Sequence, residues 1–207
     1  LIKTIKKFKP NLIIVLGDRY EMLAAPCAAI TFNIPVLHIY GGAVTEGAID
    51  DMIRHSITKL SSFHMVATDE YKKRLIQMGE ESWRIKNIGV PELKYLKKIK
   101  IFHKKKLINL LNIDLNKKTL LVNFHPVTTD THNTKNYIKN LLIAVKRSKM
   151  QAIFTYPNAD KTNEIIIKEI KRFVKKNSKK YIFIKNSGAE LYSNLLRNCY
   201  AMLGNSS

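Results

Sequence analysis

The stretch LIIVLGDR, residues 12–19, decides the fold class of this chain. Residues 12–16 form a continuous apolar run rich in β-branched side chains, and the run stops at Gly17. Such a run is typical of a strand buried in a parallel sheet, because both faces of that sheet are covered. The Ala-rich segment that follows, residues 20–31, predicts a helix.

The same alternation of strand and helix continues through the chain. Predicted strands are 12–16, 34–39, 63–67, 84–88, 119–124, 151–155, 181–184 and 200–203, and predicted helices are 20–31, 49–61, 68–78, 134–147, 161–175 and 189–198. A charged, Lys-rich and helical segment, 92–112, separates two sets of these units. The pattern predicts an α/β protein with parallel sheets, divided into residues 1–112 and 113–207.

The composition is that of a globular protein. The 207 residues are 45% hydrophobic and 25% charged, and the longest strongly apolar stretch has only the length of a strand. We therefore expect no membrane span and no secretory leader. Cys27 and Cys199 each lie in an apolar run, which fits buried, reduced thiols in a cytoplasmic protein. Because the chain begins at Leu1 and ends at Ser207, we expect it to be a piece of a longer protein.

The net charge of +20 raises the question of a nucleic-acid partner. The lysines are spread at intervals, mostly on the polar sides of predicted helices, and no zinc spacing or RNA-binding aromatic strand accompanies them. A solvated Lys-rich surface is the favoured interpretation, and a small anion such as a nucleotide would also suit a positive field. We predict no nucleic-acid partner, no metal and no cofactor.

In parallel sheets, ligands bind beyond the carboxyl ends of the strands, so the loops after strands are the candidates for a site. Asp18 and Arg19 follow the first strand; they predict either a site or a helix cap with a surface arginine. The segment HIYGGAVTEGAIDDMIRH, residues 38–55, places Asp50 with Arg54 and Asp51 with His55 at i, i+4 spacing. Surface ion pairs of this kind contribute only ~0.3–0.5 kcal/mol, and the density of titratable groups favours a site.

Three loops in the second half have the same placement. His125 follows a strand directly, where it is positioned for proton transfer or phosphate contact, or simply for a tight turn before a proline. Asn158 lies in a strand-to-helix loop. The terminal GNSS, residues 204–207, would form an anion site if a helix followed it, and otherwise a capping turn.

Together and in this order, these motifs resemble those of the UDP-N-acetylglucosamine 2-epimerases. HPVTTD, residues 125–130, is similar to the hydrolysing branch, which supplies N-acetylmannosamine for sialic acid synthesis. The resemblance covers essentially the whole chain. It implies a GT-B-like fold of two Rossmann-like domains facing across a cleft, a nucleotide-sugar substrate, and a homodimer or homotetramer.

The resemblance also implies the chemistry: removal of the C2 proton, expulsion of the nucleoside diphosphate from C1, and hydration of the resulting glycal. The catalytic candidates by this resemblance are Asp18, Asp50, His125 and Glu46, and the substrate-binding candidates are Arg19, Arg54, Asn158, Ser206 and Ser207. Relatives carry a glutamate beside the glycine pair, where this chain has Tyr40 and Ala43. Glu46 is the candidate substitute, and which carboxylate acts as base and which as acid stays open.

Several alternatives remain open from the sequence. The substrate is either UDP-N-acetylglucosamine or a diacetamido-trideoxy sugar linked to UDP or GDP. A GT-B glycosyltransferase would bind a nucleotide sugar too, but has no need of the Asp50/Arg54 helix. A non-catalytic nucleotide-sugar binder would explain the departure at Tyr40 and Ala43. We expect residues 1–207 alone to be inactive, because the diphosphate cradle stops at Ser207.

Overall fold

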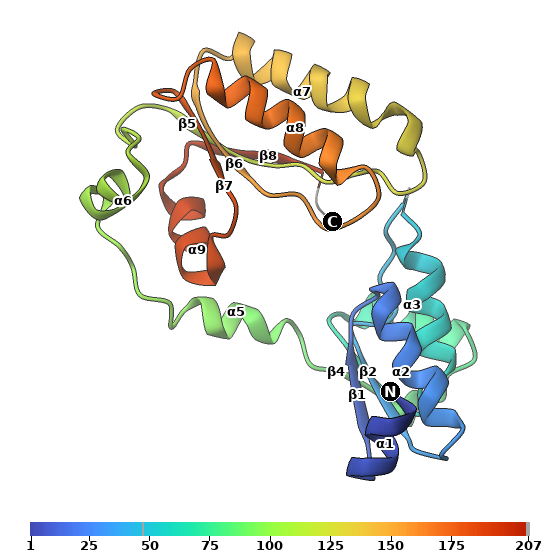
Figure 1. Cartoon of the computed structure of the whole chain (residues 1–207). Helices are drawn as coiled ribbons and strands as arrows, with labels where there is room; N and C mark the ends of the chain where they lie inside the picture. Colours follow the sequence, from blue (N-terminus) through green and yellow to red (C-terminus); the bar gives the residue numbers. More distant parts are fainter. Residues whose placement is uncertain (47, 206–207) are drawn as a thin grey trace. The chain divides into compact units, whose positions relative to one another are not determined.

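The computed structural model describes residues 1–46 and 48–205. It divides the chain into two compact units, Leu1–Lys94 and the residues from Tyr95 onward. Each unit is an α/β layer built on its own four-stranded parallel sheet (Figure 1). The predicted fold class is therefore confirmed at the level of each unit.

In the first unit the strand order follows the chain, β1-β2-β3-β4, with every neighbouring pair parallel. Its elements are α1 (Ile2–Phe8), β1 (Ile13–Leu16), α2 (Tyr20–Ile30), β2 (Val36–Ile39), α3 (Asp50–Lys59), β3 (Phe63–Val66), α4 (Asp69–Gln77), a 3-10 turn (Ser82–Arg84) and β4 (Ile85–Asn87). Thr68 caps α4 by accepting a hydrogen bond from the Tyr71 amide, as its position predicts.

In the second unit the strand order is β7-β6-β5-β8, again parallel throughout. Its elements are α6 (Lys104–Leu111), β5 (Thr119–Asn123), a 3-10 turn (Thr131–Asn133), α7 (Thr134–Arg147), β6 (Gln151–Thr155), α8 (Asn163–Lys175), β7 (Tyr181–Ile184), α9 (Gly188–Asn198) and β8 (Ala201–Gly204).

The second sheet is covered on both faces, because alternate residues of a strand point to opposite sides. Val122 and Phe154 pack in one cluster with the apolar stripes of α7 and α8. Leu121 and Ile153, their neighbours in sequence, pack in another cluster with Leu107 of α6 and Leu195 of α9. Figure 1 shows α7 and α8 on one side of the sheet and α9 on the other.

The first strand is less buried than its composition predicts. Val15 is 2% exposed and packs with residues of α2 and α3, but Ile14 and Leu16 are 60% and 53% exposed. Among the described residues β1 lies at the edge of its sheet and its odd-numbered residues face the helices, so the predicted burial on both faces is not met within this chain.

The segment 92–112 also differs from the prediction of one helix. It forms α5 (Pro91–Leu96) and α6, separated by an irregular stretch. Leu107 packs in the core of the second unit, so α6 belongs to that unit. The contacts between residues divide the chain after Lys94, whereas the division predicted from the sequence follows Asn112. The charged residues of this segment do not indicate which of its apolar side chains pack in a hydrophobic core.

The thiols differ from each other. Cys27 is exposed, contrary to the prediction of a buried thiol, and Cys199 is half-buried, where burial raises its pKa to about 11. Among the described residues, no helix has the length and apolarity to cross a membrane.

Candidate functional site

The first cluster lies at the carboxyl ends of the strands of the first unit. The chain leaves β1 through Gly17, whose φ of +76° favours glycine. The Gly17 amide donates to the Ile39 carbonyl at 2.9 Å, which ties the turn to the end of β2. Asp18 follows in this turn, so the sequence placed it correctly at the edge where ligands of parallel sheets bind.

Arg54 holds this cluster together from α3. Its side chain is 3% exposed, and its Nε and Nη2 both donate to Oδ2 of Asp18, the former at 2.9 Å. Nη1 donates to the Ala43 carbonyl at 2.8 Å, and Nη2 donates to Thr45 Oγ1 at 2.9 Å. Asp51 completes the set by forming an ion pair with Nη1. A buried charge needs such partners, and here every donor nitrogen of Arg54 has an acceptor.

Asp51 is a member of this cluster that the sequence did not single out. It was paired with His55 by spacing, but its Oδ1 instead pairs with Arg54 and accepts from the Thr45 amide at 2.8 Å. His55 Nδ1 is buried, and no described residue forms a hydrogen bond with it. The i, i+3 spacing of Asp51 and Arg54 was the available signal. Asp50, the predicted catalytic residue, is the first residue of α3 and is partly exposed.

The glycine pair is fixed by close packing. A Cβ on Gly41 would lie 3.0 Å from both His38 Nδ1 and Thr58 Oγ1. A Cβ on Gly42 would lie 2.6 Å from the Tyr71 carbonyl oxygen, and its φ is +82°. Gly42 therefore requires glycine both for space and for backbone conformation, whereas a side chain at Gly41 would force His38 and Thr58 to shift slightly.

Tyr40, beside the glycine pair, adopts a positive φ of 69°, which is rare for an aromatic residue. Its hydroxyl donates to the Glu92 carboxylate at the start of α5, and burial together with this bond raises the tyrosine pKa to about 12. Glu46 is exposed on the loop that follows. Arg19 forms an ion pair with Glu21 at 3.4 Å at the start of α2.

The second cluster surrounds His125 in the other unit. Its ring Nδ1 accepts from the Asn158 amide at 2.9 Å. Its backbone is bound reciprocally by Asn205: the His125 amide donates to Oδ1 at 2.8 Å, and the carbonyl accepts from Nδ2 at 3.0 Å. Since Nδ1 accepts, the proton of the neutral ring lies on Nε2, which makes Nε2 a donor. Burial lowers the pKa of His125 and favours this neutral form.

This second cluster shows why its loops contain small residues. A Cβ on Gly204 would lie 2.0 Å from the Asn123 carbonyl oxygen, so the close pairing of β5 and β8 requires glycine. Asn205 was not predicted as a site residue, although its position directly after a strand was a signal. Asn158 contributes its backbone here. Ser206 and Ser207, the predicted diphosphate ligands, lie outside the described residues.

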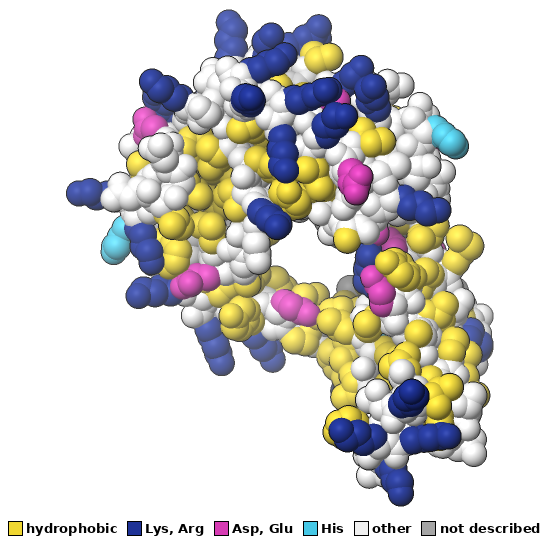
Figure 2. Space-filling view, in the orientation of Figure 1, with side chains coloured by type: hydrophobic (Ala, Val, Ile, Leu, Met, Phe, Trp, Pro, Cys, Tyr) yellow, Lys and Arg dark blue, Asp and Glu magenta, His cyan; other side chains and the backbone are white. Residues whose placement is uncertain are grey.

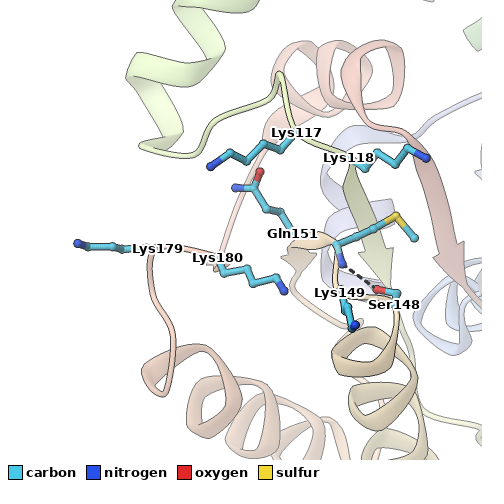
Figure 3. A pocket seen from close by; sticks show the side chains of 8 residues that line it. Lys117, Lys118, Ser148, Lys149, Gln151, Lys179 and Lys180 are labelled. Carbon is cyan, nitrogen blue, oxygen red and sulfur yellow. Dashed lines mark hydrogen bonds between the residues drawn. The ribbon is translucent and has the colours of Figure 1, made fainter.

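The opposite edge of the second sheet, where β5, β6 and β7 begin, carries a hollow of about 480 Å³. Lysines line it together with Gln151 (Figure 3). Their side chains diverge: Lys118 lies over the Tyr200 ring at 4.7 Å, while Lys179 extends in the opposite direction in Figure 3. Figure 2 likewise shows Lys and Arg side chains dispersed over the visible face.

Comparisons with known proteins identify the family of this chain. The profile of the family described as UDP-N-acetylglucosamine 2-epimerase matches residues 1–207. The chain belongs to the UDP-N-acetylglucosamine 2-epimerase family. The predicted resemblance to this family is thus confirmed.

Individual members of this epimerase family are similar over nearly the whole chain. A GDP/UDP-N,N'-diacetylbacillosamine 2-epimerase (hydrolyzing) from Campylobacter jejuni is 41% identical over 96% of the chain, and 52% of that protein is covered. A UDP-N-acetylglucosamine 2-epimerase from Neisseria meningitidis is 33% identical over 97% of the chain, again with 52% covered. The chain thus spans about half the length of the curated relatives it matches.

Solved structures of epimerases show the same fold. The UDP-GlcNAc 2-epimerase from Neisseria meningitidis bound to UDP-GlcNAc superposes with a TM-score of 0.82 at 22% identity, covering 100% of this chain and 57% of the other. The enzyme from Rickettsia bellii gives a TM-score of 0.77 at 20% identity, covering 99% and 54%. These likenesses confirm the GT-B-like, Rossmann-like class predicted from the sequence.

Proposed function

We propose that the protein to which this chain belongs is a hydrolysing 2-epimerase of a nucleotide-linked 2-acetamido sugar. The observation that carries the proposal is the Arg54 cluster, in which one buried guanidinium orients the carboxylates of Asp18 and Asp51. Family membership and the activities for which the relatives are named support the reaction class.

The Arg54 cluster suits proton transfer at carbon because it fixes one oxygen of each carboxylate. Both bonds to Asp18 end on Oδ2, and both described bonds to Asp51 end on Oδ1. In the described part of the chain no residue bonds to the other oxygen of either carboxylate. We assign these two oxygens to the removal and return of the proton at C2, which requires an acid and a base on the sugar.

His125 suits the departure of the diphosphate. Its neutral ring presents Nε2–H. The Asn158 amide donates to the ring, and Asn205 accepts from the His125 amide and donates to its carbonyl, which fixes the ring and its turn. A preorganised donor of this kind stabilises negative charge as it develops on the leaving oxygen. We propose that Asn158 orients His125 through its backbone amide and does not itself bind the substrate. Ser206 and Ser207 remain the proposed ligands of the diphosphate.

The sugar is the finer part of the proposal. UDP-N-acetylglucosamine, converted to N-acetylmannosamine and UDP, is one candidate. The UDP- or GDP-linked diacetamido sugar is the other, and we favour it because relatives that are 41% and 36% identical are both named as diacetylbacillosamine 2-epimerases. Tyr40, which occupies the strained position beside the glycine pair, is our candidate for the residue that distinguishes the two sugars.

The test uses the full-length parent protein in deuterated water, with each nucleotide sugar in turn, followed by proton NMR. Release of the free 2-epimeric sugar with deuterium at C2, together with the nucleoside diphosphate, is the expected result. Epimerised sugar that stays linked to the nucleotide would move the protein to the non-hydrolysing branch. Absence of turnover with all of these sugars would refute the proposal.

A pair of variants links the reaction to the cluster. Asp18→Asn removes the proposed proton carrier and should lower kcat by about 100-fold or more. Asp114→Asn is the matched control, because this exposed carboxylate lies 4.0 Å from Lys117 and far along the chain from the Arg54 cluster. Equal activity of the two variants would remove Asp18 from the mechanism.

A further inference from the structure

Two buried histidines lie side by side under the first cluster. His38 on β2 and His64 on β3 are register partners in the parallel sheet and are 0% and 1% exposed. Fully buried polar rings need hydrogen-bond partners. Both nitrogens of His38 are bonded, whereas among the described residues only Nε2 of His64 is. His64 Nε2 contacts Glu80 at 3.2 Å, and Glu80 also pairs with Lys59 at 2.6 Å.

His38 is bonded toward the proposed site instead. Its Nε2 lies 2.9 Å from the Gly17 carbonyl oxygen, and its Nδ1 lies 3.1 Å from Thr58 Oγ1. A carbonyl oxygen only accepts, so Nε2 carries the proton and donates. In the neutral ring Nδ1 then accepts, and the Thr58 hydroxyl donates to it. Burial lowers the pKa of His38 to about 4, which keeps the ring neutral.

Through these bonds His38 connects the segments that carry the cluster. The Gly17 residue is held at both ends, since its amide donates to Ile39 and its carbonyl accepts from His38. Asp18 is the next residue. Thr58 lies on α3, one turn beyond Arg54, and the ring and hydroxyl together fill the space over Gly41.

We propose that His38 is a positioning residue whose neutral ring fixes the Gly17–Asp18 turn relative to α3, and thereby the geometry of Asp18 toward Arg54. The expected effect on kcat rests on the proposed function. The role of His38 in holding the Gly17–Asp18 turn does not depend on the reaction and can be tested separately. Misplacement of a catalytic group by about 1 Å costs about 100-fold in rate.

The experiment compares four variants in the full-length protein. His38→Leu removes both ring nitrogens and keeps apolar bulk. His38→Gln retains an N–H donor on a side chain of similar reach. Thr58→Val removes the hydroxyl and keeps the shape. His64→Leu is the matched control, because it removes an equally buried ring from the neighbouring strand without touching Gly17.

Enzyme kinetics distinguish a loss of the positioning of Asp18 from a general loss of core packing. His38→Leu should lower kcat by about 100-fold while KM changes by less than about threefold, and His38→Gln should recover at least about tenfold of that loss. His64→Leu should lower Tm by about as much as His38→Leu does, but should keep kcat within about threefold of the wild-type value. Equal loss of kcat in His38→Leu and His64→Leu, or no recovery in His38→Gln, would overturn the proposal.

Hydrogen exchange tests the turn itself. The Gly17 amide should exchange about tenfold faster or more in His38→Leu and Thr58→Val, and at the wild-type rate in His64→Leu. Unchanged exchange in His38→Leu would overturn the proposal even if activity fell. If wild type turns over none of the sugars, the proposed function fails and the exchange result alone decides the role of His38. If His38→Leu does not fold, Thr58→Val compared with His64→Leu tests the turn, and unchanged exchange of the Gly17 amide in Thr58→Val would then overturn the proposal.

Discussion

Replacing Arg54 with lysine keeps the charge of the first cluster and removes its planar set of donors. The guanidinium reaches Asp18 on one side and the Ala43 carbonyl, at 2.8 Å, on the other. A lysine ammonium is a compact charge with fewer donors, so it can serve one side only. The side chain is 3% exposed, so water does not replace the lost bonds.

The size of the effect follows from those bonds. Each hydrogen bond to a charged group contributes about 1.5–3 kcal/mol, and breaking a buried ion pair costs about 3–5 kcal/mol. We therefore expect Arg54→Lys to lower the free energy of unfolding of the first unit by about 3–5 kcal/mol. The control is Arg172→Lys, whose side chain is 64% exposed and lies 3.4 Å from Glu169. An exposed pair of this kind contributes about 0–1 kcal/mol.

Urea unfolding measures both variants. Circular dichroism follows the whole chain, and fluorescence of Trp83, the single tryptophan of the sequence, assigns the transition of the first unit. A loss in Arg54→Lys of less than about 1 kcal/mol, or one equal to that in Arg172→Lys, would refute the reasoning that these donors are engaged in the folded chain.

Three further predictions concern stability. Gly42→Ala should lower the free energy of unfolding by about 2 kcal/mol more than Gly79→Ala, as measured in urea. Both glycines have positive φ, but only a Cβ at residue 42 would meet backbone, at 2.6 Å. Equal losses in the two variants would contradict this contact. Burial lowers the pKa of His38 from 6.5 to about 4, so the unfolded chain binds more protons and stability should fall by about 3 kcal/mol as pH drops through that window. Burial also lowers the pKa of His64 and of His125, so His38→Gln should remove only the His38 share of this pH dependence, and an unchanged slope would assign it to other groups. Asn205→Ala removes the reciprocal bonds to the backbone of His125 and should speed exchange of the His125 amide about tenfold, as measured by NMR.

Local patterns were sufficient for most of the secondary structure. The predicted strand 151–155 coincides with β6 (Gln151–Thr155), and the predicted helix 134–147 coincides with α7 (Thr134–Arg147). A continuous apolar run and a helical stripe each specify their own periodicity, so neighbours in sequence suffice to identify them. The placement of Asp18 and His125 directly after strands was predictable for the same reason.

The exposed side of β1 and the break between α5 and α6 were not predictable in this way. Ile14 and Leu16 have the same composition signal as Val15, yet only Val15 meets the helices. In α6, Leu107 is buried because the second sheet offers it Leu121. Burial of an apolar residue depends on a partner that the local sequence does not specify.

The sequence by itself determined the alternating elements, the family and the loops that carry polar residues, because these depend on residue type and short-range spacing. The tertiary structure alone decided that Asp51 joins Asp18 on Arg54, and that His38 supports the turn before Asp18. Hydrogen bonds and ion pairs between distant segments depend on distances of about 3 Å, and only the packing of helices on a sheet sets these distances.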